Sequence, residues 1–160
     1  MSFSPGASTR IELTHLRAQS TASVRETVRR DDLTDALGRM YQEVSAVLAR
    51  QGVQPGGPRF ARYHSFGETI DLEAGMHVSV PIRPEGKVVP GSLPAGPAAR
   101  TVHVGSYETL QDTYAALAAW QERGGRSPSG GPWEVYLTDP SSEPDPARWR
   151  TEVLWPLAMR

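Results

Sequence analysis

Acidic and aromatic side chains gather in the last quarter of the chain, on two segments that have the length of strands. Alternate residues of a strand point to opposite faces of its sheet. Glu134 and Tyr136 therefore share one face of segment 133–138, and Glu152 lies midway along segment 149–155. If the two strands are neighbours, we expect these three side chains on one surface. A carboxylate that such a surface shelters from water can hold a cation or act as a general base.

The same pattern also fits less reactive arrangements. On a solvated sheet face, Arg150 and Glu152 would form a surface ion pair worth at most about 1 kcal/mol. Trp149 and Trp155 fit a hydrophobic core as well as a binding site. Trp133, which alternates with Glu134, is expected to face the helices. Periodicity alone leaves these alternatives open.

Other common site chemistry is absent from the sequence. It contains no glycine-rich phosphate loop, no nucleophile elbow and no histidine pair at helical spacing. No cysteine is present, which excludes disulfides, thiol nucleophiles and thiolate metal sites. We therefore expect no metal and no cofactor. The histidines are isolated in sequence and are predicted to be structural or solvated: His15, His64, His77 and His103.

Size and charge limit the class of protein. A chain of 160 residues, 38% of them apolar, can build one globular core. With 17 basic and 18 acidic residues it has no overall positive field, so nucleic acid is not expected as a partner. No apolar run has the length of a secretory signal or a membrane span, so no membrane association is expected. The lack of cysteine suits a cytoplasmic location.

Two segments show helical periodicity. Apolar residues recur every three or four positions over 33–48 and again over 110–118. Asp31 and Asp32 are predicted to cap the first helix, and Gly52 to end it.

The order of elements repeats along the chain. Residues 1–9 are predicted to be a flexible leader, and 10–160 a single domain with halves at about 10–82 and 98–157. Each half reads strand, helix, strand, strand, with a Gly-Gly-Pro turn after the helix, and the proline- and glycine-rich stretch 83–97 connects the halves. The predicted fold is α+β, built from duplicated βαββ units related by a pseudo-two-fold axis around a central ligand cleft.

Four stretches resemble a known family. They are LPAGP (93–97), VHVGSYE (102–108), GPWEVYLTDP (131–140) and WRTEVLWP (149–156). In this order and at these distances they resemble the GyrI-like small-molecule-binding domain. They are also similar to the effector-binding domains of multidrug-sensing regulators of the MerR and AraC types. The resemblance runs from about residue 11 to residue 157, and its second half is the specific part.

The resemblance implies a pocket for bulky, often cationic, aromatic compounds. Glu152 matches the position of the family's buried acid, and Glu134 shares its predicted surface. The aromatic residues at motif positions are Tyr107, Trp133, Tyr136 and Trp155. Aromatic faces add roughly 0.5 to 2 kcal/mol each through cation–π contact. The expected function is multidrug binding or sequestration.

Two other functions follow from the same resemblance. Some stand-alone GyrI-like proteins hydrolyse the cyclopropane ring of DNA-alkylating natural products. Glu152 would then be the general base, and Tyr136 or Tyr107 would donate to the developing oxyanion. The third possibility is an interaction with a protein partner, such as inhibition of DNA gyrase.

The sequence differs from the regulators in one respect. Those proteins place a helix-turn-helix domain before the ligand domain, whereas only about ten residues precede the first predicted strand here. We therefore expect a stand-alone binder that does not itself contact DNA.

Overall fold

The computed structural model describes residues 10–159 and has the predicted α+β class. The predicted leader, residues 1–9, lies outside the described residues. A single sheet with the order β1-β6-β8-β7-β3-β4-β2-β5 is antiparallel at every pairing. Its strands are β1 (Glu12–Leu16), β2 (Gln19–Arg29), β3 (Pro55–Phe66), β4 (Thr69–Val78), β5 (Val89–Leu93), β6 (Gly96–Val104), β7 (Trp133–Tyr136) and β8 (Arg150–Pro156). The helices are α1 (Leu33–Gln51) and α2 (Leu110–Arg123).

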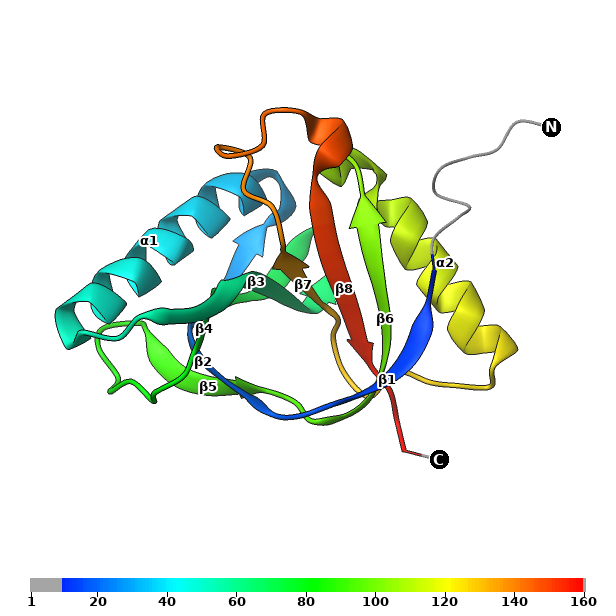
Figure 1. Cartoon of the computed structure of the whole chain (residues 1–160), viewed down its shortest axis with the longest axis horizontal. Coiled ribbons are helices and arrows are strands. Elements are labelled where there is room, and N and C mark those ends of the chain that lie inside the picture. The colour runs from blue at the N-terminus through cyan, green and yellow to red at the C-terminus, as the bar shows by residue number, and fades with distance from the viewer. Residues whose placement is uncertain (1–9, 160) are drawn as a thin grey trace.

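The sheet is curled, because two pairs of consecutive strands, β1 with β2 and β5 with β6, each run almost without interruption from one half to the other. Two residues separate β1 from β2, and two separate β5 from β6. Leu16 pairs with Gly96 and Gln19 pairs with Leu93, so the antiparallel register is the same on both sides of the break. This long ribbon joins the two halves below the central strands (Figure 1).

Both helices cover the same face of the sheet. α1 packs on β2 and β4 through residues that include Met40 and Val44, and it ends at Gly52, which has a φ of 67°. The expected end is therefore confirmed, but Asp32 precedes the helix without a side-chain cap hydrogen bond. α2 packs through Leu117 on Ala99 of β6. The helices flank the central strands β7 and β8 on two sides (Figure 1).

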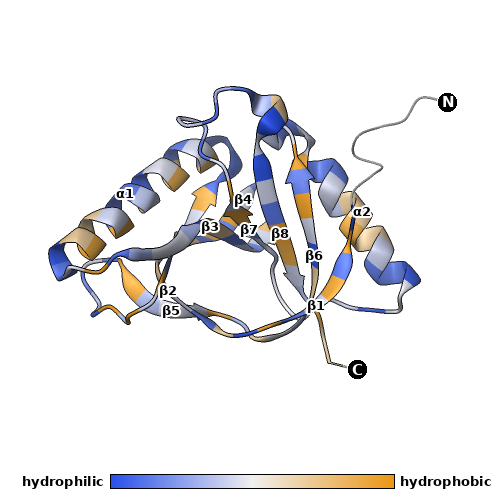
Figure 2. Cartoon of the chain, viewed as in Figure 1, coloured by the Kyte–Doolittle hydropathy of each residue, from blue (hydrophilic) through white to orange (hydrophobic). Residues whose placement is uncertain are grey.

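The opposite face of the sheet is also partly buried. Inside the curl, Phe60, Leu93, Trp133, Val135 and Leu154 form a second apolar cluster. Hydropathy therefore does not alternate strictly along β8, whose first part is hydrophilic and whose middle is hydrophobic (Figure 2). All three residues at the start of β7 are buried, although they point to alternate faces.

Two segments that were predicted to be turns or connections are strands. Pro55-Gly56-Gly57-Pro58 was expected to be a turn, but β3 begins at Pro55 and its pairing with β4 is shifted between Pro55 and Arg59. The connection 83–97 contains β5 and the start of β6. Glycine and proline at these positions lie near an edge or an irregular pairing, where strands tolerate them. The order strand, helix, strand, strand occurs twice, as β2-α1-β3-β4 and β6-α2-β7-β8, and a further strand, β1 or β5, precedes each.

Gly75 permits a close approach between β4 and β2. A Cβ atom at this position of β4 would lie 2.0 Å from the backbone oxygen of Ala22 on β2. We therefore expect Gly75→Ala to lower the free energy of unfolding by about 3 kcal/mol, measured by urea denaturation. In the control Gly38→Ala, on the exposed face of α1, a Cβ atom meets nothing within 4 Å, so this variant should be slightly more stable than the wild type. Equal stabilities of the two variants would contradict the role of Gly75.

Candidate functional site

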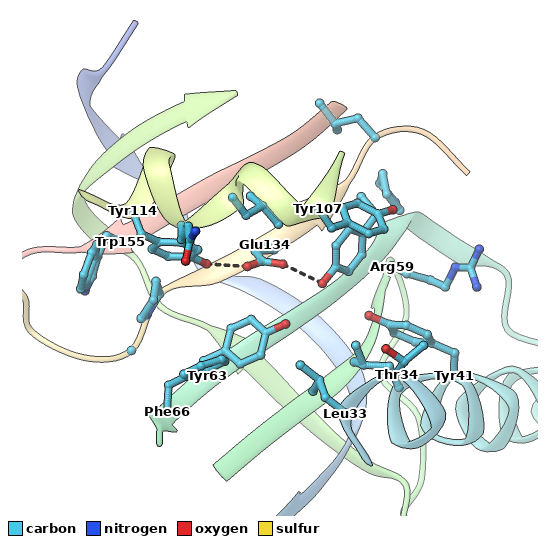
Figure 3. Close-up of a pocket in the computed structure, with 18 of the residues that line it drawn as sticks. Leu33, Thr34, Tyr41, Arg59, Tyr63, Phe66, Tyr107, Tyr114, Glu134 and Trp155 are labelled. Carbon is cyan, nitrogen blue, oxygen red and sulfur yellow. Dashed lines mark hydrogen bonds between the residues drawn. The ribbon is translucent and has the colours of Figure 1, made fainter. Parts of the chain in front are cut away.

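A large cleft opens between the two helices. It has a volume of about 1610 Å³, which exceeds the roughly 300 to 1,000 Å³ of ordinary ligand pockets. Its floor consists of residues from β3, β7 and β8, and α1 and α2 form its two walls. Figure 3 shows side chains from both walls converging on the floor. The cleft therefore has room for a bulky ligand.

Glu134 lies at the floor of this cleft. The residue is 5% exposed, and its neighbours across the sheet, Ala61 on β3 and Val153 on β8, are fully buried apolar residues. The hydroxyl of Tyr114 donates to Oε2 over 2.6 Å, and that of Tyr136 donates to Oε1 over 2.8 Å. Both hydrogen bonds are drawn in Figure 3. Each carboxylate oxygen thus has one phenolic donor.

Burial raises the pKa of the Glu134 carboxyl above its usual value, although the hydrogen bonds from Tyr114 and Tyr136 act in the opposite direction. Burial also raises the pKa of both phenols, and the negative charge of Glu134 raises each further. The tyrosines therefore remain protonated donors at physiological pH. The carboxyl titrates closer to neutrality than a solvated glutamate does.

Aromatic rings surround this acid. Tyr107, which precedes α2, lies 5.9 Å from the ring of Tyr136 and 4.8 Å from that of Trp149. Tyr114 and Trp155 are 5.9 Å apart in an edge-to-face arrangement. On the α1 side, Tyr41 and Tyr63 also line the cleft (Figure 3). Such rings offer faces to a flat or positively charged ligand.

Two arginines lie at the edge of the cleft. The guanidinium carbon of Arg59 is 5.3 Å above the ring of Tyr41, and Nη2 of Arg59 is 3.5 Å from a carboxylate oxygen of Asp139. Arg30 lies 4.8 Å above the ring of Phe66. The edge thus carries positive charge at Arg59 and Arg30, beside the acids Asp139 and Glu108, while Glu134 lies at the floor.

Glu152 does not face this cleft, which corrects the expectation that it shares a surface with Glu134. Directly paired residues of antiparallel strands point to the same side. Glu152 pairs with Val135, whereas Glu134 pairs with Val153, so the two acids lie on opposite faces. Glu152 is 19% exposed in its side chain and accepts a 2.6 Å hydrogen bond from Arg100 Nε. It lines a smaller cavity of about 550 Å³ inside the curl.

Trp133 also differs from its predicted position. It is 2% exposed and packs inside the curl with Phe60 and Leu154, and not beneath the helices. The guanidinium carbon of Arg62 lies 5.4 Å above its ring. The structure therefore brings together four of the predicted site residues in the cleft, namely Glu134, Tyr107, Tyr136 and Trp155.

Tyr114 lines the candidate site, and the sequence interpretation did not include it. It lies within the predicted helical segment 110–118, and it contacts the core under α2. Its hydroxyl nevertheless needs a partner when buried, and that partner is Glu134. A tyrosine on the buried face of a helix was the available signal, but the position of its partner depended on the tertiary fold.

Three of the four histidines, His64, His77 and His103, make structural contacts, and His15 is exposed on β1. His103 bonds Thr113 over 2.7 Å and the backbone oxygen of Ser106 over 3.0 Å, which fixes the start of α2 against β6. His64 lies 2.9 Å from Glu73. Within residues 10–159, no group of three or more potential ligands is arranged to hold a metal ion. In the same part of the chain, neither helix combines the length and apolarity needed to cross a bilayer.

A cleft of this size between two helices, closed below by one antiparallel sheet, defines a small-molecule-binding domain of the α+β class. The chain belongs to the GyrI-like family, because the family model described as "GyrI-like small molecule binding domain" matches residues 9–158. The resemblance inferred from the sequence motifs is thus confirmed. Comparison with curated protein sequences gives no match.

Solved structures with similar folds include the C-terminal domain of EcmrR, with a TM-score of 0.84 and 22% identity over 96% of this chain and 99% of that domain. EcmrR in a complex with DNA gives a TM-score of 0.85 and 23% identity over 95% of this chain. This chain spans 58% of the EcmrR chain in that complex. The structure of SAV2435 bound to tetraphenylphosphonium gives a TM-score of 0.62 and 13% identity over 93% of this chain and 94% of that chain. A hydrolase from Listeria innocua gives a TM-score of 0.65 and 14% identity over 93% of this chain and 92% of that chain.

Proposed function

We propose that this protein binds bulky aromatic cations, with Glu134 as the counter-charge. The observation that carries the proposal is the environment of this carboxylate. Among the residues that the structure describes, Glu134 forms no ion pair with lysine or arginine, and its hydrogen bonds come from the neutral phenols Tyr114 and Tyr136. A buried carboxylate without a positive partner is costly. A cationic ligand supplies that partner.

The physical properties of the cleft fit such a ligand. A delocalised cation with aromatic substituents is weakly hydrated and loses little on leaving water. Tyr41, Tyr63 and Tyr107 offer it several ring faces, and cation–π contacts contribute roughly 0.5 to 2 kcal/mol each. This kind of recognition depends on shape and charge more than on a hydrogen-bond pattern, so several compounds should bind. The structure of SAV2435 with tetraphenylphosphonium supports this ligand class for the fold.

A pair of ions with the same shape and opposite charge tests the proposal. Tetraphenylphosphonium and tetraphenylborate are titrated into the protein by isothermal calorimetry. We expect the phosphonium to bind and the borate to bind far more weakly. Similar affinities for both ions, or binding of the borate alone, would show that Glu134 does not set the charge preference.

The arrangement of Glu134 and two phenols also favours a second function, hydrolysis of a cyclopropane ring. Glu134 would remove a proton from water as the water oxygen bonds to a ring carbon. The ring carbon–carbon bond breaks, and its electron pair moves into a conjugated carbonyl. Once Glu134 has taken the proton, the hydroxyl of Tyr114 or Tyr136 turns away from it and donates to the resulting oxyanion. The similar fold of a Listeria innocua hydrolase supports this alternative.

Mass spectrometry distinguishes the two functions. An enzyme converts a cyclopropane-bearing alkylator into a product that has gained one water molecule, and Glu134→Gln should abolish this conversion. An unchanged alkylator after long incubation would exclude the hydrolase.

Interaction with a protein partner, such as gyrase, stays a prediction, as does the cytoplasmic location.

We also infer that the cleft lies at the junction of two duplicated units. The strand order supports this: strands β7 and β8 in the second half occupy places that mirror those of β3 and β4 in the first. Each unit contributes one helix as a wall of the cleft. Glu134 itself comes from the second unit alone.

A further inference from the structure

The cleft contains a positive charge that a simple cation-binding site does not need. Arg59, on β3, places its guanidinium 5.3 Å above the ring of Tyr41, at the edge of the same cleft that has Glu134 at its floor. Figure 3 shows the Arg59 side chain beside Tyr41 and Tyr107. A ligand that carries only positive charge is repelled by this group. The position of Arg59 therefore bears on which ligands the cleft accepts.

The two opposite charges act on the same part of the cleft. Burial is the main cause that raises the pKa of Tyr41 and of Tyr107. The negative charge of Glu134 raises both further, and the positive charge of Arg59 lowers both. Both tyrosines line the cleft between the floor and the edge. A ligand that touches these rings therefore lies between the carboxylate of Glu134 at the floor and the guanidinium of Arg59 at the edge.

The present partner of Arg59 holds it weakly. Nη2 of Arg59 is 3.5 Å from Oδ2 of Asp139, whereas a charge-assisted hydrogen bond between such groups measures about 2.7 to 2.9 Å. Both side chains are 44% exposed. The other carboxylate oxygen of Asp139 accepts a hydrogen bond from the backbone N–H of Ser141. A ligand anion can therefore replace Asp139 at Arg59 without disrupting a buried ion pair.

We propose that the preferred ligands are amphoteric aromatic compounds: a delocalised cation that reaches Glu134, joined to a carboxylate or similar anion that reaches Arg59. Arg59 is then the residue that selects for the anionic group. This inference rests on the proposed function and narrows its ligand class. It explains why arginine occupies the edge of a cleft with an acid at its floor.

Rhodamine B and its ethyl ester test this inference, because they share one aromatic cation and differ in a free carboxylate. Binding is measured at pH 8 by fluorescence anisotropy. We expect the wild type to bind the free acid about fivefold more tightly than the ester, the size of a partly exposed ionic contact. Arg59→Gln should remove this preference, because it weakens binding of the free acid and strengthens binding of the ester. Arg39→Gln, at a similarly exposed arginine on α1 outside the cleft, should leave the preference unchanged.

The outcomes separate this inference from the proposed function. Equal binding of the two dyes to the wild type, or tighter binding of the ester, overturns the role of Arg59 while cation binding stands. A preference for the free acid that persists in Arg59→Gln also overturns the role of Arg59 while cation binding stands. If neither dye binds and tetraphenylphosphonium also fails to bind, the proposed function is wrong and this inference falls with it.

Discussion

Replacing Glu134 with glutamine is expected to weaken tetraphenylphosphonium binding by about 100-fold. Removal of one partner from a desolvated charge pair typically costs about 2 to 5 kcal/mol, and 1.4 kcal/mol corresponds to a factor of ten. The glutamine side chain has nearly the same size and can still accept a hydrogen bond from Tyr114 or Tyr136, so the shape of the cleft should persist. Binding is measured by isothermal calorimetry at pH 8.

Glu152→Gln is the matched control. It makes the same chemical change on the opposite face of the sheet, where Glu152 forms an ion pair with Arg100. We expect less than a twofold change in phosphonium affinity. If Glu152→Gln were the more damaging variant, the acid suggested by the family motif would be the functional one, and the assignment of Glu134 would be wrong.

The second large expected effect is a rise of cation affinity with pH. In the empty cleft burial raises the pKa of Glu134, so the carboxyl is neutral below that pKa and charged above it. A cation binds the charged form and lowers the pKa again. Affinity should therefore increase up to about tenfold per pH unit below the raised pKa and level off above it. Calorimetric titrations at assay pH values from about 5 to about 9 check this. This range begins just above the usual pKa of glutamate.

A neutral aromatic ligand should show no such dependence, and neither should the Glu134→Gln variant with either ligand. A phosphonium affinity that stays constant in the wild type across this range would mean that Glu134 does not change protonation when the ligand binds. That result would contradict the proposed coupling between ligand binding and the protonation of Glu134.

The same raised pKa has a consequence for stability. A carboxyl whose pKa is higher in the folded than in the unfolded state binds more protons when folded, so stability falls as pH rises from the unfolded to the folded pKa. The cost is fully present above the folded pKa. Glu134→Gln removes this cost, and the variant should be more stable than the wild type at neutral pH while it binds cations less well. Such a trade-off is common for functional groups that are buried.

Both faces of the central strands are buried, and this explains the error at Glu152. When one face of a strand is solvated, alternation of apolar and polar residues reveals which side is the core. In β7, Trp133 faces the apolar interior of the curl and Glu134 faces the cleft, and both are almost inaccessible to solvent. Apolar and polar residues alternate only weakly along these strands, so the sequence contained no indication of which side carried the helices.

Local patterns in the amino-acid sequence were enough to determine the α+β class, the two helices, the repeated order of elements and the family. The reason is that helix periodicity, glycine at a helix end and short motifs all depend on residues that are close in sequence. Only the tertiary structure decided that Glu134, and not Glu152, lies at the floor of the cleft. That choice depends on the register between β7 and β8 and on the curl of the sheet. Both bring together residues far apart in sequence, and a shift of one residue in pairing exchanges the two faces of a strand.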